Sequence, residues 1–281
     1  MKITVIISAH KKRREMEFVL AGYAAQTRPA DEIIVSQDGE FPEIAEAVAN
    51  SRHLGLPLIH LTQEHRGFGK CRALNKAILQ ATGDLLLFTD GDCVPRDDFV
   101  ETYLRLSRPG TFLAGGSHIS VPEQYHQAHD LRQHILDQKL FDYAFLSAIP
   151  GFDKSRNRLL RNPRLQRFYD FLSPRNAFSG ANSCAWRIDV LKVGGFDESM
   201  AYGGEDLNMG LRLNNIGVRG VRARHSIVSL HLDHGRGYYD AALHQANQAW
   251  NREVRAKGIV YPRASPIRPH ELMGQAADRH R

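Results

Sequence analysis

Two aspartates at the end of an apolar run are the residues of this chain best suited to chemistry. Residues 85–92 read Leu-Leu-Leu-Phe-Thr-Asp-Gly-Asp, so only Gly91 separates Asp90 from Asp92. In an extended segment residues i and i+2 point to the same side, so both carboxylates can face one site. Their oxygens suit a hard divalent cation, Mn²⁺ or Mg²⁺, which in turn suits a bound diphosphate. The alternative is a polar turn after a buried strand, since Asp-Gly is a common turn pair.

Two further groups precede this motif. Asp38 follows the apolar run 32–36, and in an open parallel sheet ligands bind outside the carboxyl ends of the strands. Asp38 is therefore placed to accept hydrogen bonds from a ribose or a base, unless it only forms an Asp-Gly turn. Lys70 and Arg72 stand in the first turn of a predicted helix, where the helix dipole disfavours cations. A bound phosphate would explain them, and a solvent-facing basic turn is the alternative.

Two clusters of glycines and acids follow later, at residues 194–198 and 203–206. Gly204 allows close backbone approach, and Glu205 and Asp206 open a predicted helix over 205–215. A carboxylate at a rigid helix start is a candidate general base. Acids in a first turn also favour the helix dipole without any catalytic role, which is the structural alternative.

Two histidines after the apolar run 227–230 could complete a metal site. His231 or His234 would add an imidazole nitrogen to the oxygens of Asp90 and Asp92. The chain contains 14 histidines, so a surface histidine without function is the competing interpretation.

The elements that must position these residues alternate between strands and helices. Apolar runs spaced by roughly 25 to 30 residues, with helix-compatible segments between them, predict βαβ units and a parallel sheet. The predicted strands are Ile3–Ile7, Glu32–Ser36, Pro57–Leu61 and Asp84–Phe88. An apolar stripe predicts a helix over 70–81, which Gly83 would end as a C-cap glycine.

The remaining segments lack this regular alternation of strands and helices. Residues 121–175 are predicted to be a mostly helical or irregular insertion, and residues 262–281 a loosely held tail. Within 154–175, apolar residues alternate with Lys154, Arg156, Arg158, Arg161, Arg164 and Arg167. This pattern fits either a surface for anionic lipid or acceptor, or a surface helix that packs one face. It matches no nucleic-acid-binding motif, and nucleic acid is not an expected partner.

Composition limits the class of protein. With 42% hydrophobic and 24% charged residues, the 281-residue chain is an ordinary folded protein. A net charge of +6 makes polyanions plausible partners. Three dispersed cysteines without a CxxC pattern favour a reducing cytoplasm. The N-terminal apolar run is too short for a signal peptide, and no run reaches membrane-spanning length. We expect a protein in the cytoplasm, free or peripheral at the inner face of the membrane.

In their order along the chain, these motifs resemble those of the family-2 glycosyltransferases of the GT-A fold, which use nucleotide-sugar donors. The resemblance rests on residues 3–10, 26–39, 69–75 and 89–92, with Gln37 where the family often has an aspartate. The blocks 194–198 and 203–208 resemble the acceptor side of galactosyl- and N-acetylgalactosaminyltransferase-like domains. Residues 121–175 and the tail have no counterpart.

The resemblance implies an α/β architecture: one GT-A domain over residues 1–240 with a mostly parallel central sheet flanked by helices. Residues 1–95 would bind the nucleotide-sugar, 121–175 would be a variable acceptor-side insertion, and 177–235 would form the acceptor and catalytic half. Residues 241–281 would add a C-terminal helix and tail.

It also implies an inverting, metal-dependent transfer of a sugar, from a UDP-sugar in the first instance, to a hydroxyl of a glycan or glycolipid in surface polysaccharide or lipopolysaccharide synthesis. Asp206 would be the catalytic base, and Glu205, Gly204 and Trp186 would bind acceptor. The divalent cation, Mn²⁺ or Mg²⁺, would be held by Asp92 and His231, with Asp90 in a weaker role. The donor would be bound by Ser8, His10, Asp38, Lys70, Arg72, Asp90, Gly91 and Asn182. A sugar-phosphate nucleotidyltransferase and a non-catalytic glycan-binding module are the alternatives.

Overall fold

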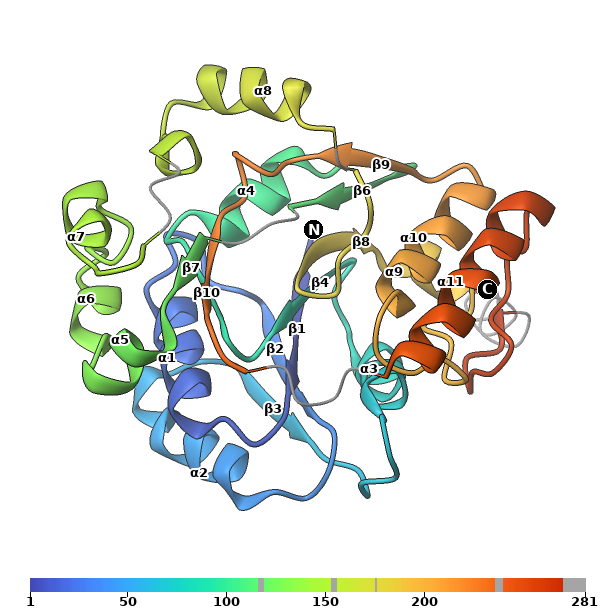
Figure 1. The fold of residues 1–281 in the computed structure, drawn as a ribbon, viewed down its shortest axis with the longest axis horizontal. Helices are drawn as coiled ribbons and strands as arrows, with labels where there is room; N and C mark the ends of the chain where they lie inside the picture. Colours follow the sequence, from blue (N-terminus) through green and yellow to red (C-terminus); the bar gives the residue numbers. More distant parts are fainter. Residues whose placement is uncertain (116–118, 153–155, 175, 236–239, 270–281) are drawn as a thin grey trace.

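The computed structural model describes residues 1–115, 119–152, 156–174, 176–235 and 240–269. Across these residues the chain forms a seven-stranded sheet in the order β3-β2-β1-β4-β8-β6-β9, with helices on both faces (Figure 1). The first four strands in that order are parallel. They are β1 (Ile3–Ala9), β2 (Glu32–Gln37), β3 (Leu58–Leu61) and β4 (Leu85–Asp90). All four predicted strands and the α/β class are confirmed.

The other half of the sheet reverses direction. β8 (Asn182–Trp186) is antiparallel to both β4 and β6 (Thr111–Ala114), and β6 is parallel to β9 (Arg219–Arg222). A smaller sheet joins β5 (Cys93–Pro95), β10 (Ser229–Leu232) and β7 (Ile119–Val121). Because β5 follows β4 directly, this small sheet carries β10 to the carboxyl end of β4.

Hydrophobic burial explains why the first strands read as continuous apolar runs. Val5 and Ile7 of β1 pack into a core with α1 (Arg13–Ala24) and α2 (Pro42–Asn50). Ile6 faces a second core that includes α3 (Lys70–Gln80), α9 (Arg187–Lys192) and α10 (Glu205–Asn215). Strands covered on both faces have no polar side, so they lack the alternation of half-exposed strands.

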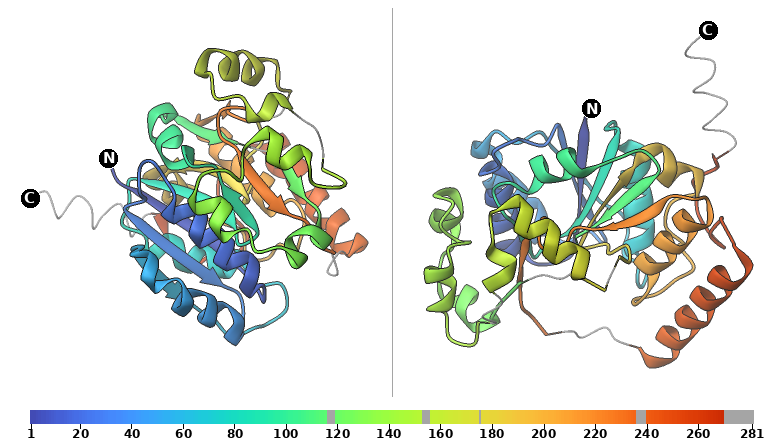
Figure 2. Two further views of the ribbon diagram at one scale, coloured as in Figure 1. Left: turned by 90° about the vertical axis from the view of Figure 1, so that its left-hand side faces the viewer. Right: turned by 90° about the horizontal axis from the view of Figure 1, so that it is seen from above.

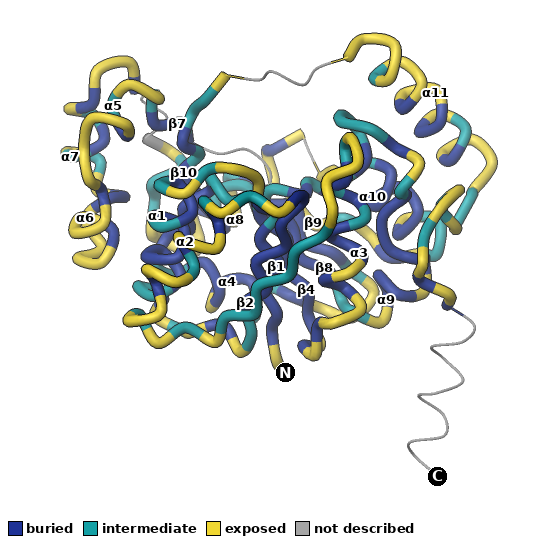
Figure 3. The backbone as a smooth tube through the Cα atoms, turned by 90° about the horizontal axis from the view of Figure 1, so that it is seen from below, coloured by how far each residue is buried: buried dark blue, intermediate teal, exposed yellow. Residues whose placement is uncertain are grey.

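Residues 121–175 are mostly helical, as predicted. They contain α5 (Glu123–Ala128), α6 (Arg132–Leu136), α7 (Tyr143–Ser147), a short 3₁₀ turn (Arg156–Leu159) and α8 (Pro163–Leu172). Before them, α4 (Phe99–Leu106) packs Phe99, Val100 and Tyr103 into the same core as Val5 and Ile7. Figure 3 shows long exposed stretches along α5, α6 and α7, in contrast to the buried course of β1.

Two local predictions are wrong. Gly83 does not cap the helix, since α3 ends at Gln80 and Ala81 follows in an extended conformation. A Cβ on Gly83 would lie 2.6 Å from the backbone nitrogen of Thr4, so this glycine permits close approach to β1. For the predicted loose tail over 262–281, residues 262–269 are held in place, because Ile267 is buried and Asp197 accepts the Arg263 and Ala264 N–H groups. Residues 270–281 lie outside the described residues.

Helix α11 (Ala241–Lys257) packs against α10. Asp240 caps its N-terminus by accepting the backbone N–H groups of Ala242 and Leu243. Within the described residues, no helix combines the length and apolarity needed to cross a bilayer.

Candidate active site

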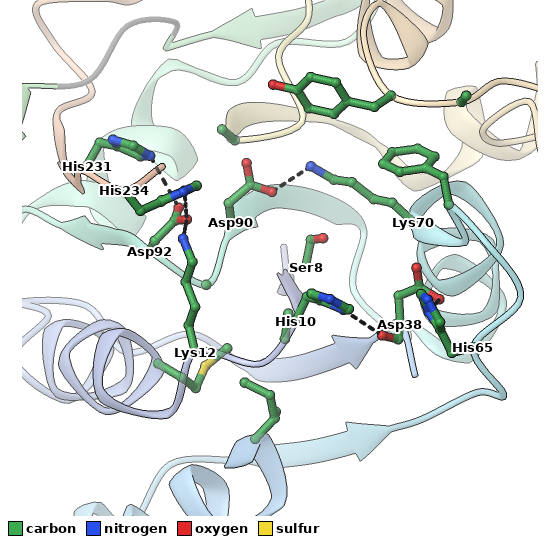
Figure 4. Close-up of a pocket in the computed structure, with 18 of the residues that line it drawn as sticks. Ser8, His10, Lys12, Asp38, His65, Lys70, Asp90, Asp92, His231 and His234 are labelled. Atoms are coloured by element: carbon green, nitrogen blue, oxygen red, sulfur yellow. Dashed lines mark hydrogen bonds and ion pairs between the residues drawn. The ribbon is translucent and has the colours of Figure 1, made fainter. Parts of the chain in front are cut away.

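A cavity of about 770 Å³ lies at the carboxyl ends of β1, β2 and β4 (Figure 4). Its wall contains eight residues that the sequence predicts to bind donor or metal: Ser8, His10, Asp38, Lys70, Asp90, Gly91, Asp92 and His231. Parallel strands end at one edge of a sheet, and that topology gathers residues distant in sequence.

The two acids of the Asp-Gly-Asp motif face this cavity but contact different cations. Asp90 is the last residue of β4, and the Lys70 ammonium donates to its Oδ1 at 2.7 Å. Asp92 Oδ2 lies 3.1 Å from Lys12 Nζ and 3.0 Å from His234 Nε2. Gly91 donates its N–H to Ser8, and a Cβ there would lie 2.8 Å from Met16 Cε. The motif is therefore tightly packed, and its acids have separate surroundings.

Asp92, His231 and His234 form a candidate metal centre. Their potential ligand atoms all lie within 4.8 Å of one another. His231 reaches Asp92 because β10 pairs antiparallel with β5, which places His231 opposite Cys93. One carboxylate and two imidazoles fit Mn²⁺ better than Mg²⁺, which prefers oxygen ligands throughout. Asp90 is not a member of this group, and the weaker contact with the metal that the sequence indicates for it stays a prediction.

The charges around Asp92 shift its protonation and that of His234. Burial alone would raise the pKa of Asp92, but the hydrogen bond from His234 and the charges of Lys12 and His231 hold it well below its usual range. The hydrogen bond to Asp92 in turn raises the pKa of His234, although burial opposes the shift. The site is thus an anionic carboxylate surrounded by nitrogen groups.

Asp38 closes the other end of the cavity beside a cluster of rings. Its carboxylate accepts the Gly69 N–H and the Gln63 amide, each at 2.8 Å. The His10 ring meets Phe41 edge to face with centroids 4.8 Å apart. His65 lies 5.8 Å from His10 between ring centroids. Rings and a carboxylate together offer stacking and hydrogen bonding to a planar heterocycle.

Lys70 connects this cavity to the acids of α10. Burial would lower the pKa of Lys70, but the negative charges of Asp90, Glu205 and Asp206 raise it, so the ammonium stays charged. Asp206 Oδ2 accepts the Gly180 N–H at 3.2 Å, and the neighbouring Ala181 lines the cavity. A Cβ on Gly180 would lie 3.7 Å from Asp206 Cβ and 3.8 Å from Lys70 Nζ. Asp206 therefore lies just behind the cavity wall, next to Lys70.

Glu205 is turned inward. It is 6% exposed and accepts the Gly203 N–H at 2.9 Å. Burial and the charge of Asp206 raise its pKa. Gly204 precedes it with a φ of +96° and meets the amide of Asn251 where a Cβ would stand. Both residues shape the loop before α10, and the direct acceptor contacts predicted for them are not supported by this geometry.

Three other predicted binding residues are placed elsewhere. Trp186 pairs with Leu85, at the opposite end of β4 from Asp90, and donates to the Arg108 carbonyl. Asn182 is fully buried and accepts the Tyr103 hydroxyl. Arg72 donates to the Glu64 carbonyl and is absent from the cavity wall. The geometry gives no support to the roles predicted for Trp186 and Asn182, because β8 runs antiparallel to β4 and both side chains hydrogen-bond to other parts of the fold. Arg72 stands two residues after Lys70 in the first turn of α3, so the two side chains point to different sides of the helix.

Several further residues line the wall of the cavity. Lys12, His65, Phe68 and Tyr202 line the cavity without having been predicted. A signal existed for Lys12, which belongs to the basic run 11–14 directly after β1. The loop residue His65 and Tyr202, which precedes the Gly-Gly-Glu-Asp block, had no comparable pattern.

Comparison with known proteins decides the family. Residues 4–177, more than half of the chain, match the family described as Glycosyl transferase family 2. The chain belongs to this family. Family membership supports a glycosyltransferase rather than a nucleotidyltransferase or a glycan-binding module.

Among curated proteins, the chain is 27% identical over 261 residues to an uncharacterized glycosyltransferase of Bacillus subtilis (strain 168), YfnE. The match covers 83% of this chain and 65% of that relative, so the chain spans less than two thirds of its length.

Two solved structures share the fold. The mannosyltransferase PcManGT from Pyrobaculum calidifontis, in complex with GDP-Man and Mn²⁺, aligns with a TM-score of 0.59 and 20% identity over 98% of this chain and 69% of that chain. TarS residues 1–349 from S. aureus, in complex with UDP-GlcNAc, align with a TM-score of 0.61 and 15% identity over 92% of this chain and 70% of that chain. These likenesses establish the GT-A architecture.

Proposed function

We propose that this chain is an inverting, metal-dependent glycosyltransferase that moves a sugar from a nucleotide-diphosphate donor, a UDP-sugar in the first instance, to a hydroxyl of a glycan or glycolipid. The observation that carries the proposal is the cluster of Asp92, His231 and His234 beside Asp90. Structural neighbours that hold GDP-Man with Mn²⁺, or UDP-GlcNAc, support this assignment.

The donor would lie along the cavity. The ring cluster and Asp38 suit the nucleoside, because they combine flat faces with a hydrogen-bond acceptor. Lys12 and Lys70 extend toward the acids that mark the diphosphate position. A divalent cation bound by Asp92, His231 and His234 would neutralise negative charge on the departing diphosphate.

Asp206 is the proposed base. The acceptor oxygen forms its bond to C1 of the sugar as the bond from C1 to the diphosphate breaks, and the hydroxyl proton passes to an Asp206 oxygen. A single displacement of this kind inverts the configuration at C1. The Lys70 ammonium lies near both Asp206 and Asp90. It would stabilise negative charge on the base and on the departing diphosphate. Precise placement of the acceptor would supply much of the rate.

Replacing the base tests this mechanism. In Asp206→Asn, transfer to acceptor should fall by about 10²- to 10⁴-fold while UDP binding survives, because only proton transfer is lost. The matched control is Asp84→Asn, because Asp84 is exposed and directly precedes β4, at the end away from the cavity. Transfer near the wild-type rate in Asp206→Asn would show that another group takes the proton.

A second experiment addresses the metal. Asp92→Ala should abolish the Mn²⁺-dependent part of UDP binding measured by calorimetry, because it removes the carboxylate of the cluster. EDTA should have the same effect on the wild-type chain. Equal UDP affinity with and without EDTA would refute the metal site.

The proposal extends to a physiological setting. A glycan or glycolipid of a surface polysaccharide or lipopolysaccharide, elongated in the cytoplasm, agrees with the positive net charge of the chain. Transfer assays against candidate acceptors, with UDP-, GDP- and dTDP-sugars in turn, would identify both substrates.

A further inference from the structure

Helix α8 buries polar side chains and exposes apolar ones. Its two buried side chains are polar, Gln166 and Asp170, which stand one turn apart. Its large apolar side chains face solvent: Leu165 is 46% exposed, Phe168 57%, Phe171 77% and Leu172 57%. A surface helix normally buries its apolar stripe, and clustered exposed apolar residues mark interaction sites.

Hydrogen bonds hold the helix in this orientation. The Gln166 amide donates to the Leu160 carbonyl at 2.6 Å. Asp170 accepts the His225 N–H at 2.6 Å and the Ser226 hydroxyl at 2.5 Å. Arg222 donates to the Phe171 and Ser173 carbonyls at the C-terminal end. Turning the apolar face inward would break these hydrogen bonds, including the buried bond between Ser226 and Asp170, so the fold maintains the exposure of the phenylalanines.

The exposed face is also basic. Arg164 and Arg167 are exposed and stand one turn before Phe168 and Phe171 respectively. Neither arginine makes an ion pair with any residue that the structure describes, whereas Arg161 is bound to Asp97 at 2.9 Å. Apolar side chains interleaved with uncompensated cations on one face match the chemistry of an anionic bilayer surface.

We propose that α8 docks the protein on an anionic phospholipid membrane. The phenylalanines and leucines would enter the boundary between headgroups and acyl chains, and Arg164 and Arg167 would contact anionic headgroups. A second copy of the chain fits this face less well. A ten-residue helix is about 15 Å long and about 10 Å wide, and stable interfaces bury ~800 Å² per partner. In Figures 1 and 2 α8 lies at the rim of the molecule, where a flat surface can reach it.

Vesicle co-sedimentation with the full chain tests the proposal without donor or acceptor, so its outcome is independent of the proposed activity. The wild-type chain should pellet with phosphatidylcholine vesicles containing phosphatidylglycerol and much less with phosphatidylcholine alone. The double variant Phe168→Ser/Phe171→Ser should lower the partition coefficient at least about tenfold. Arg164→Gln/Arg167→Gln should lower it by about tenfold on anionic vesicles and leave the neutral ones unchanged.

Exposed apolar residues on other helices supply the matched control. Leu79 on α3 and Ile188 on α9 are 42% and 47% exposed, and Leu79→Ser/Ile188→Ser should bind anionic vesicles as the wild type does. Wild-type chain that stays in the supernatant with anionic vesicles would overturn the proposal. So would equal loss in the control variant. Dimerisation in ultracentrifugation without lipid, abolished by the phenylalanine substitutions, would instead assign the face to a second copy.

Discussion

At the scale of single residues, three nitrogen groups meet at the Asp92 carboxylate. Lys12 Nζ and His234 Nε2 lie 3.1 and 3.0 Å from the same oxygen, and His231 Nε2 lies 3.8 Å from the other. A metal bound to Asp92 Oδ2 would meet the Lys12 ammonium in the same place. Lys12 is therefore both a neighbour of the predicted diphosphate and a competitor of the cation.

This competition predicts the behaviour of Lys12→Ala. Mn²⁺ alone should bind up to about fivefold more tightly, since a partly exposed ion pair no longer has to be broken. Lys11→Ala removes an adjacent cation that rests on the Phe41 ring and should leave metal affinity unchanged. Isothermal titration of both variants with MnCl₂ makes the comparison, and weaker binding in Lys12→Ala would contradict the competition.

The same cluster predicts how Mn²⁺ binding depends on pH. The hydrogen bond to Asp92 raises the pKa of His234 above its ordinary value of about 6.5, so the protonated form persists to higher pH. A metal needs the neutral imidazole, and binding must release this proton. Mn²⁺ affinity should therefore fall as pH falls through the raised pKa. His234→Ala should bind Mn²⁺ more weakly near neutrality and show a shallower pH profile, both measurable by titration from pH 5.5 to 8.

At the scale of elements, β8 explains why one predicted ligand is structural. Its antiparallel course puts Asn182 opposite Thr89, next to the end of β4 but under the cavity. The Asn182 amide accepts the buried Tyr103 hydroxyl and donates to the Ile227 carbonyl near β10. The Asn182 side chain therefore links β8 to α4 and to the segment that leads into β10, the strand of His231.

Asn182→Ala should consequently act on stability rather than on donor contacts. We expect the free energy of unfolding to fall by about 1–3 kcal/mol, because the Tyr103 hydroxyl is left buried without its partner. Urea unfolding measures the loss. The paired variant Asn182→Ala/Tyr103→Phe should recover part of it. A large drop in UDP affinity at unchanged stability would restore the role predicted from sequence.

At the scale of the whole molecule, Asp197 joins segments far apart in the chain. It is fully buried and accepts hydrogen bonds from Ser199, Trp250 on α11, and the backbone of Arg263 and Ala264. Burial alone would raise the pKa of Asp197, but the hydrogen bonds from Arg263, Ser199 and Ala264 lower it. Asp197 thus fastens the C-terminal segment against the loop that leads to Glu205 and Asp206.

Removing this carboxylate should loosen that half of the protein. Asp197→Ala should lower the free energy of unfolding by about 3 kcal/mol or more at neutral pH, since several buried donors lose their acceptor. Because the folded-state pKa is depressed, the contribution of Asp197 is present above about pH 4 and is lost as pH falls through the folded value. The difference between the variant and the wild type should therefore shrink in acid. Chemical denaturation at several pH values tests it, with Asp84→Ala as the exposed control.

Helices and strands that have a clear local pattern of apolar and turn residues can be predicted from the sequence alone. The helix over 205–215 was predicted at its observed bounds, and the four parallel strands were placed within a few residues, because apolar period and turn residues act over short distances. The convergence of Ser8, Asp38 and Asp90 followed too, since parallel strands end at one edge.

Only the tertiary structure decided the rest, since it depends on which segments pair across long separations. Because β8 runs antiparallel to β4, Trp186 lies beside Leu85, at the end of β4 away from the cavity, and Asn182 is buried. No local pattern specifies that strand direction. Long-range pairing of β10 with β5 placed both His231 and His234 on Asp92, where the sequence left a choice between them. The burial of the polar face of α8 likewise depends on partners more than fifty residues away in sequence, because His225 and Ser226 donate to Asp170. The sequence by itself determined the fold family and the carboxylates of the site, and tertiary packing determined which nitrogen groups surround them.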